Sequence, residues 1–202
     1  SAWEILVAET NPEYVTFEVD VAWAAHAGVD VAALIEQYGD RIELLHIKDA
    51  VNLNAGGRPT FTNLGDGDMP LQEILAAGQE AGVAYYVMEY DMAADGESFA
   101  TTGFEYLTGE AAGGSEEPTE PVTIPVDKVS MQLYSLSSWS RQIGWEGVYD
   151  RLGEIGFENV EPWVLEERTY YQTQQPDPDR ANPFFEFDPQ MCILCTRCVR
   201  AC

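Results

Sequence analysis

The sequence predicts an α/β fold of parallel strands, because strand-like and helix-like segments alternate along most of the chain. Three strand candidates, residues 15–20, 42–47 and 83–88, are almost continuously apolar, as in strands buried on both faces. Each strand-plus-helix unit takes roughly 30 to 40 residues, close to one eighth of a TIM barrel. We therefore expect a partial or permuted TIM (β/α) barrel, followed by a short cysteine-rich C-terminal tail.

Helices are expected between these strands, where apolar residues recur at helical spacing. Asp30 is suited to cap the first helix, and Gly39 lies where a helix-ending glycine belongs. Asp68 is suited to cap the second helix, which Gly82 ends. Residues 50–67, rich in Asn, Gly and Pro, are expected to form a loop between them.

Changes in composition divide the chain into five segments. We expect the C-terminal half of a barrel over 1–108, an acidic Gly/Pro linker over 109–127, a βαβ start of a similar barrel over 128–163, a second linker over 164–182, and a ferredoxin-like cysteine segment over 183–202. Less regular helical spacing at 98–107 completes the first segment. The third contains strand candidates at 129–134 and 157–161 and a helix at 145–155.

The charge balance excludes one class of partner. The chain has 35 acidic and 10 basic residues, for a net charge of −25. A nucleic-acid partner would require the opposite sign. The excess is either an ordinary solvated acidic surface or an adaptation to high salt, where screening removes the self-repulsion, and we favour a halophilic origin.

Two further features indicate the compartment. No run of 18 apolar residues occurs, so we expect no membrane partner. All four cysteines lie in the last eleven residues, which argues against a disulfide framework and fits a reducing, cytoplasmic location.

Three polar residues close three successive strand candidates: Asp20, His46 and Glu89. The carboxyl ends of parallel strands converge on one side of such folds, so these side chains are expected to meet. Two carboxylates and one imidazole suit Mn²⁺ or Mg²⁺, and also Zn²⁺ or Co²⁺. A bound ion can polarise a sugar carbonyl, and a neighbouring carboxylate can move a proton on the adjacent carbon. Each residue alone has a structural or solvated alternative, but the repetition at three strand ends favours a site.

Four motifs surround these residues: D-x-x-W-x-x-x-A-G-x-D at Asp20–Asp30, R-I-x-L-L-H-I-K-D at Arg41–Asp49, G-x-G at Gly65–Gly67 and E-x-D at Glu89–Asp91. In order and spacing they resemble the sugar phosphate isomerase/epimerase family, which has a xylose isomerase-like TIM barrel. The resemblance covers about half of the chain and implies strands six to eight of that barrel.

The resemblance also implies individual roles. Asp20, His46 and Glu89 match metal ligands, and Glu89 also matches an acid/base glutamate. Trp23 and Lys48 match positions that line the substrate pocket, although a packed Trp and an exposed Lys are equally open readings. The implied substrate is a small sugar or sugar phosphate.

The segment at 128–163 resembles the beginning of the same family. Gln132–Ser135 match its first strand, and Glu161 matches the acid that ends its second strand, where we expect a substrate contact. A fourth metal ligand, a glutamate from an earlier strand, is expected upstream of Ser1. The chain is then either a tandem or permuted protein whose segments pair, or a truncated fusion. Open sheet edges would favour a homodimer.

The cysteines suggest a second kind of site. They follow C-x₂-C-x₂-C-x₃-C spacing, the bacterial ferredoxin arrangement, at Cys192, Cys195, Cys198 and Cys202. The surrounding FFEFDPQMCILCTRCVRAC resembles the ferredoxin-like segment of formate dehydrogenases and of the iron–sulfur subunit of NADH dehydrogenase. A 4Fe-4S cluster is therefore expected, with a zinc site or incidental thiols as alternatives.

Three functions follow from these observations. The first is a metal-dependent sugar isomerase/epimerase-type domain. The second is a 4Fe-4S electron-transfer protein, and the third is an inactive truncated fusion that keeps parts of both sites.

Overall fold

The structure, a computed structural model, describes residues 2–53, 57–91, 93–109 and 121–162 of the chain. The chain divides into two units, residues 1–161 and 162–202. Apart from Pro162, the second unit lies outside the described residues. The expected linker at 164–182 and the four cysteines are therefore outside the described residues too.

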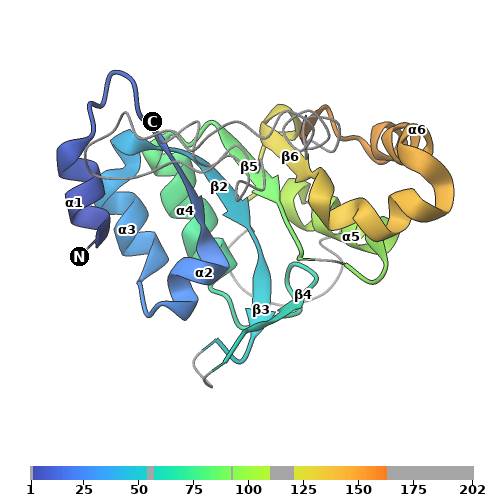
Figure 1. The fold of residues 1–202 in the computed structure, drawn as a ribbon, viewed down its shortest axis with the longest axis horizontal. Helices are drawn as coiled ribbons and strands as arrows, with labels where there is room; N and C mark the ends of the chain where they lie inside the picture. Colours follow the sequence, from blue (N-terminus) through green and yellow to red (C-terminus); the bar gives the residue numbers. More distant parts are fainter. Residues whose placement is uncertain (1, 54–56, 92, 110–120, 163–202) are drawn as a thin grey trace, which may run out of the picture. The chain divides into compact units, whose positions relative to one another are not determined.

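The first unit is built on a five-stranded sheet (Figure 1). In spatial order the strands are β1 (Phe17–Asp20), β2 (Ile42–Ile47), β5 (Tyr85–Met88), β6 (Val129–Gln132) and β7 (Asn159–Glu161). Every neighbouring pair is parallel. The predicted α/β class is thus confirmed. Five strands in an open order form no closed barrel within the described ranges.

The two strand-bearing segments on either side of the expected acidic linker share this sheet. β5 pairs with β6, and Met88 lies opposite Met131. The end of the expected linker is also part of the folded unit, because Ile124 is buried and its N–H donates to the Leu107 carbonyl at 2.7 Å. The segments therefore fold as one unit, which the sequence alone left open.

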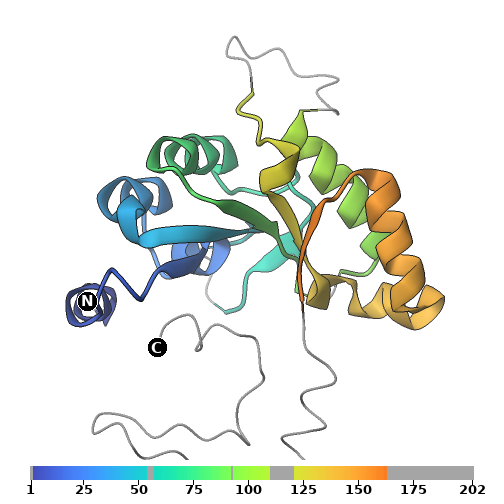
Figure 2. The same cartoon turned by 90° about the horizontal axis from the view of Figure 1, so that it is seen from above.

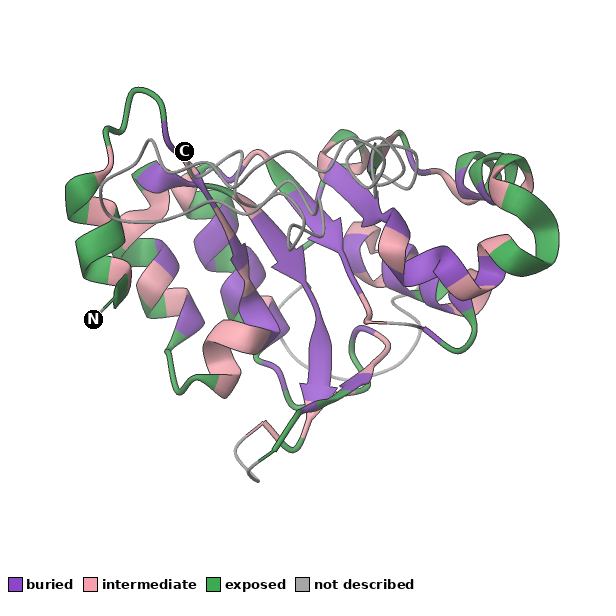
Figure 3. Cartoon of the chain, viewed as in Figure 1, coloured by how far each residue is buried: buried purple, intermediate pink, exposed green. Residues whose placement is uncertain are grey.

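Six α-helices accompany the sheet among the described residues: α1 (Ala2–Glu9), α2 (Val21–His26), α3 (Val31–Tyr38), α4 (Leu71–Ala81), α5 (Gly96–Thr108) and α6 (Ser137–Ile155). Seen from above, α3, α4, α5 and α6 follow one another in an arc outside the sheet (Figure 2). The strands and the inner helix faces are buried, whereas the outer helix faces are exposed (Figure 3). None of the helices in the described ranges is long and apolar enough to span a bilayer.

Helix boundaries follow the predicted capping only in part. The Asp30 carboxylate accepts from Ala33 N–H at 3.1 Å, as expected for the cap of α3. The predicted Asp68 cap of α4 is wrong: the residue before the helix is Pro70, without a side-chain cap. Asp68 is instead held in the preceding loop, where its N–H donates to the Ala50 carbonyl at 2.9 Å.

The predicted loop at 50–67 is also wrong in part, because it contains a hairpin. β3 (Asp49–Val51) pairs antiparallel with β4 (Thr60–Thr62). The buried Asp49 carboxylate organises the residues that follow by accepting four backbone N–H groups, from Ala50, Gly65, Gly67 and Met69. A Cβ at Gly67 would collide with Asp49 Oδ1, so the glycine allows the backbone to approach the carboxylate.

The helix predicted at 145–155 is longer, since α6 begins at Ser137 and changes direction at Gly144, where φ is 76°. Only the part after Gly144 carries the apolar spacing, through the buried Val148 and Leu152. α1 was not predicted, because its apolar residues are nearly continuous and show no helical period; none of its residues is buried. Its Trp3 ring contacts Phe17 in β1, with 4.9 Å between the two ring centroids.

Candidate metal centre

Asp20, His46 and Glu89 meet at one end of the sheet. Asp20 is the last residue of β1 and lies opposite His46 in β2, while Glu89 directly follows β5. One ligand atom from each of the three residues lies within 4.8 Å of the others. The sequence therefore places these residues at adjacent strand ends, and the structure brings them together.

His46 is the centre of this cluster, and its side chain is only 1% exposed. Its Nδ1 atom lies 2.5 Å from Glu89 Oε2. On the other side of the ring, Nε2 lies 2.8 Å from Glu161 Oε2 and 3.1 Å from Glu18 Oε1. The imidazole thus separates two groups of carboxylates.

These neighbours determine the charge of His46. Burial by itself lowers the pKa of the imidazole, but the contacts with Glu161, Glu18 and Glu89 outweigh burial and raise that pKa well above 6.5. A cation that binds at Nδ1 would therefore have to displace a proton, so its binding would strengthen as pH rises.

Lys48 is the second buried cation of the cluster. Its Nζ atom lies 3.0 Å from Asp20 Oδ2, 3.1 Å from Glu89 Oε2 and 2.8 Å from Asp91 Oδ1. Burial lowers the pKa of Lys48, but the attraction of Asp20 and Glu89 and the hydrogen bond to Asp91 give a net increase. The side chain is only 1% exposed, so the structure excludes an exposed lysine here.

Carboxylates still outnumber cations in this region. Its five carboxylates belong to Glu18, Asp20, Glu89, Asp91 and Glu161, and its cations to Lys48, Arg58 and protonated His46. Glu161 Oε1 is buried without a hydrogen-bond partner among the described residues. Buried carboxylates are costly unless they are paired or coordinate a cation. The donor set, rich in oxygen with one imidazole, suits the divalent ions that the sequence predicts.

An aromatic pair borders the cluster. Trp23, on α2, is half-buried, and its ring centroid is 5.8 Å from that of Phe61 in an edge-to-face arrangement. The exposed Arg58 lies over both rings, and its Nη2 is 2.6 Å from Asp91 Oδ2. Lys48 Nζ lies 5.1 Å from the Phe61 centroid. Trp23 is also joined to the cluster directly, because its backbone N–H donates to Asp20 Oδ1 at 3.0 Å.

Three residues of the cluster were missed in the sequence. Glu18 lies two residues before Asp20 in β1, so the two-residue period of a strand places both on one face, a signal that was present. Asp91 is the last residue of the E-x-D motif, which also carried a signal. Arg58 follows no periodic segment, and nothing local connects it with Asp91.

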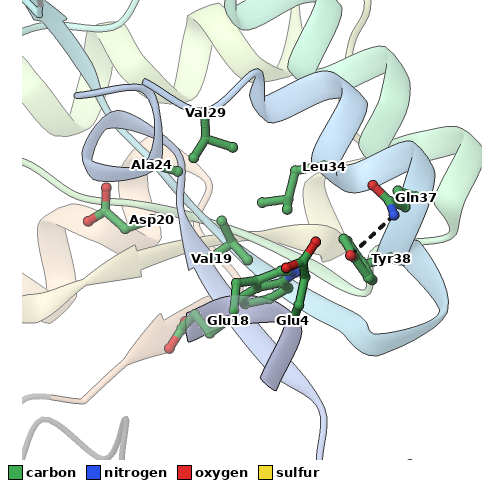
Figure 4. A pocket seen from close by; sticks show the side chains of 10 residues that line it. Glu4, Glu18, Val19, Asp20, Ala24, Val29, Leu34, Gln37 and Tyr38 are labelled. Atoms are coloured by element: carbon green, nitrogen blue, oxygen red, sulfur yellow. Dashed lines mark hydrogen bonds between the residues drawn. The ribbon is translucent and has the colours of Figure 1, made fainter. Parts of the chain in front are cut away.

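A pocket of about 460 Å³ lies beside the cluster, along the edge strand β1 (Figure 4). Val19, Val29 and Leu34 contribute apolar walls, and Glu18 and Asp20 also line it. It opens between α1, β1 and α3 (Figure 4). It adjoins the carboxylate cluster, but its lining does not include the central histidine.

Fold and site together define an α/β protein with a buried carboxylate–histidine–lysine centre. No family model and no solved structure matches the chain. A protein named "Putative formate dehydrogenase" from Staphylococcus haemolyticus is 44% identical over 43 residues, and one of the same name from Staphylococcus aureus strain USA300 is 42% identical over 43 residues. In both cases the similarity covers 21% of this chain, and the chain spans only 4% of the relative's length.

Proposed function

We propose that residues 1–162 form a divalent-cation centre of the sugar isomerase/epimerase type, with Asp20, His46 and Glu89 as ligands. The observation that carries the proposal is the meeting of these ligand atoms within 4.8 Å at three adjacent strand ends. The excess of buried carboxylate supports it independently, because a divalent cation would offset that charge. The four sequence motifs around these residues resemble those of the sugar phosphate isomerase/epimerase family, and this resemblance supports a sugar substrate.

When bound, the cation supplies polarisation of a carbonyl oxygen. Glu89 is then the group placed to take a proton from the neighbouring carbon, since it directly follows β5 and lies beside Asp20 and His46. Lys48 holds the carboxylates of Asp20, Glu89 and Asp91 in place through three contacts of 3.1 Å or less. The rings of Trp23 and Phe61 offer an apolar wall for the C–H face of a sugar.

Titration of the full chain with Mn²⁺ tests the centre. We expect about one ion per wild-type chain, strongly weakened binding in Asp20→Asn, and unchanged binding in Glu36→Gln, a matched charge loss on the exposed face of α3. Proton exchange at the carbon beside the carbonyl of a small ketose, followed by NMR in D₂O, then tests the chemistry. Equal Mn²⁺ binding by wild type and Asp20→Asn would refute the assignment.

A second function has its own observation. We propose that residues 183–202 hold an iron–sulfur cluster, supported by the C-x₂-C-x₂-C-x₃-C spacing and by the short similarity to the two staphylococcal proteins named as formate dehydrogenases. Under anaerobic reconstitution the full chain should take up iron and sulfide and gain visible absorbance that dithionite bleaches. Cys195→Ser should lose this absorbance. Uptake of zinc without colour would contradict the proposal.

A further inference from the structure

Glu161 contacts His46 although it belongs to an edge strand, β7, that does not pair with β2. It is the last residue of β7, and β5 and β6 lie between β7 and β2 in the strand order. Even so, Glu161 Oε2 lies 2.8 Å from His46 Nε2, and the Glu161 side chain is only 4% exposed. A contact across two intervening strands requires the sheet to curve, so that inward side chains from distant strands meet. The contact is thus built by the fold and is not a local accident.

The contact has a specific consequence for the histidine. An imidazole that binds a cation through one nitrogen carries a proton on the other, and the acceptor of that proton fixes the tautomer and the ring orientation. We propose that Glu161 is the positioning residue of the centre: it accepts the Nε2 proton of His46 and leaves Nδ1 for a cation beside Asp20 and Glu89. This inference rests on the proposed metal centre and replaces the substrate contact expected from the sequence.

Glu18 is the competing acceptor. Its Oε1 lies 3.1 Å from the same nitrogen, whereas Glu161 is nearer and meets hydrogen-bond geometry. Glu161 comes from the part of the chain after the acidic linker, while Asp20, His46 and Glu89 come from the part before it. Residues 128–162 therefore complete the metal centre of residues 1–108, and neither part holds the whole centre alone.

The chain has only two histidines, His26 and His46, so selective ¹⁵N-histidine NMR of the full chain reports two imidazoles. In zinc-loaded wild type we expect one His46 nitrogen to be bound and Nε2 to carry a slowly exchanging proton. Glu161→Met, similar in length but without an acceptor, should lose that proton signal and bind zinc about 10- to 100-fold more weakly. Glu161→Gln keeps an acceptor oxygen and should recover most of both. Glu158→Gln, exposed in the same segment, should match wild type.

Unchanged zinc affinity and an unchanged Nε2 signal in Glu161→Met would overturn the proposal. So would the loss, in Glu161→Gln alone, of a zinc ion that wild type and Glu158→Gln both keep, because Glu161 would then be a ligand. If Glu161→Met does not fold, Glu161→Gln must shift the Nε2 signal more than Glu18→Gln does, and the reverse order overturns the proposal. A wild type that binds no zinc refutes the metal centre, while the Nε2 signal of the zinc-free samples still tests the Glu161 contact.

Discussion

Asp49 offers the sharpest test of how a buried carboxylate stabilises the loop that follows the β3–β4 hairpin. Asp49 is 2% exposed, and its carboxylate accepts four backbone N–H groups at 2.9 to 3.2 Å. Oδ1 accepts from the N–H groups of Ala50 and Met69, and Oδ2 accepts from those of Gly65 and Gly67. Asp49→Asn keeps one acceptor oxygen and turns an NH₂ group toward two of the donors. Asp49→Ala removes all four acceptor contacts.

A hydrogen bond to a charged group contributes about 1.5–3 kcal/mol, and the contributions of neighbouring bonds are not additive. We therefore expect the free energy of unfolding to fall by about 2–4 kcal/mol in Asp49→Asn and by about 4–5 kcal/mol in Asp49→Ala. Asp66→Asn removes the same charge at an exposed position of the same loop and should stay within about 0.5 kcal/mol of wild type.

Urea unfolding followed by circular dichroism measures all three variants. Amide hydrogen exchange at Ala50, Gly65, Gly67 and Met69 adds a local readout, because one of the two pairs of amides loses its acceptor in Asp49→Asn. If Asp49→Asn and Asp66→Asn unfold at the same urea concentration, the carboxylate does not stabilise this loop, and the reasoning fails.

Other predictions follow from buried or charged groups. Tyr86→Phe should stabilise the protein by about 1–2 kcal/mol in urea, because the Tyr86 hydroxyl is buried without a partner among the described residues; a loss of stability would contradict this. Burial raises the pKa of Tyr86 to about 12, above its unfolded value near 10. From about pH 10 to 12 the hydroxyl therefore ionises in the unfolded chain but not in the folded one, and the wild type loses stability that Tyr86→Phe keeps. Stability curves of wild type and Tyr86→Phe that run parallel over this range would refute that assignment. Raising KCl from 0.1 M to about 2 M should increase the urea midpoint, since screening reduces the self-repulsion of a net charge of −25, and an unchanged midpoint would refute a halophilic adaptation. Mn²⁺ at about 1,000 times its Kd should stabilise wild type by about 4 kcal/mol but not Asp20→Asn, as thermal unfolding with and without EDTA would show.

The parallel strands and the meeting of Asp20, His46 and Glu89 could be predicted because their signals are local. Apolar runs predict the strands β2 and β5. The polar residues at or next to the strand ends predict where Asp20, His46 and Glu89 lie. Parallel pairing then brings these ends together without any further information, since neighbouring strands run in the same direction.

The remaining features depend on contacts between distant residues. The loop that follows the hairpin is held by the Asp49 carboxylate, which accepts backbone N–H groups up to 20 residues away, and no periodicity reports such an arrangement. The role of Glu161 depends on the curvature of the sheet, which brings it to a histidine 115 residues earlier. Its position at a strand end could be predicted, but the group it contacts could not.

Leu107 and Ile124, which lie on either side of the expected acidic linker, meet through the hydrogen bond from the Ile124 N–H to the Leu107 carbonyl. The entropic cost of bringing two such positions together grows only with the logarithm of the number of residues between them. Doubling that number should therefore lower the stability by about 0.6 kcal/mol. The length of the connection between Leu107 and Ile124 should therefore matter little to stability, while the pairing of β5 with β6 keeps the two parts of the centre together. Variants in which a Gly/Ser segment doubles the length of the connection between Leu107 and Ile124 should keep their cation affinity. A large loss of affinity would show that this connection itself shapes the centre.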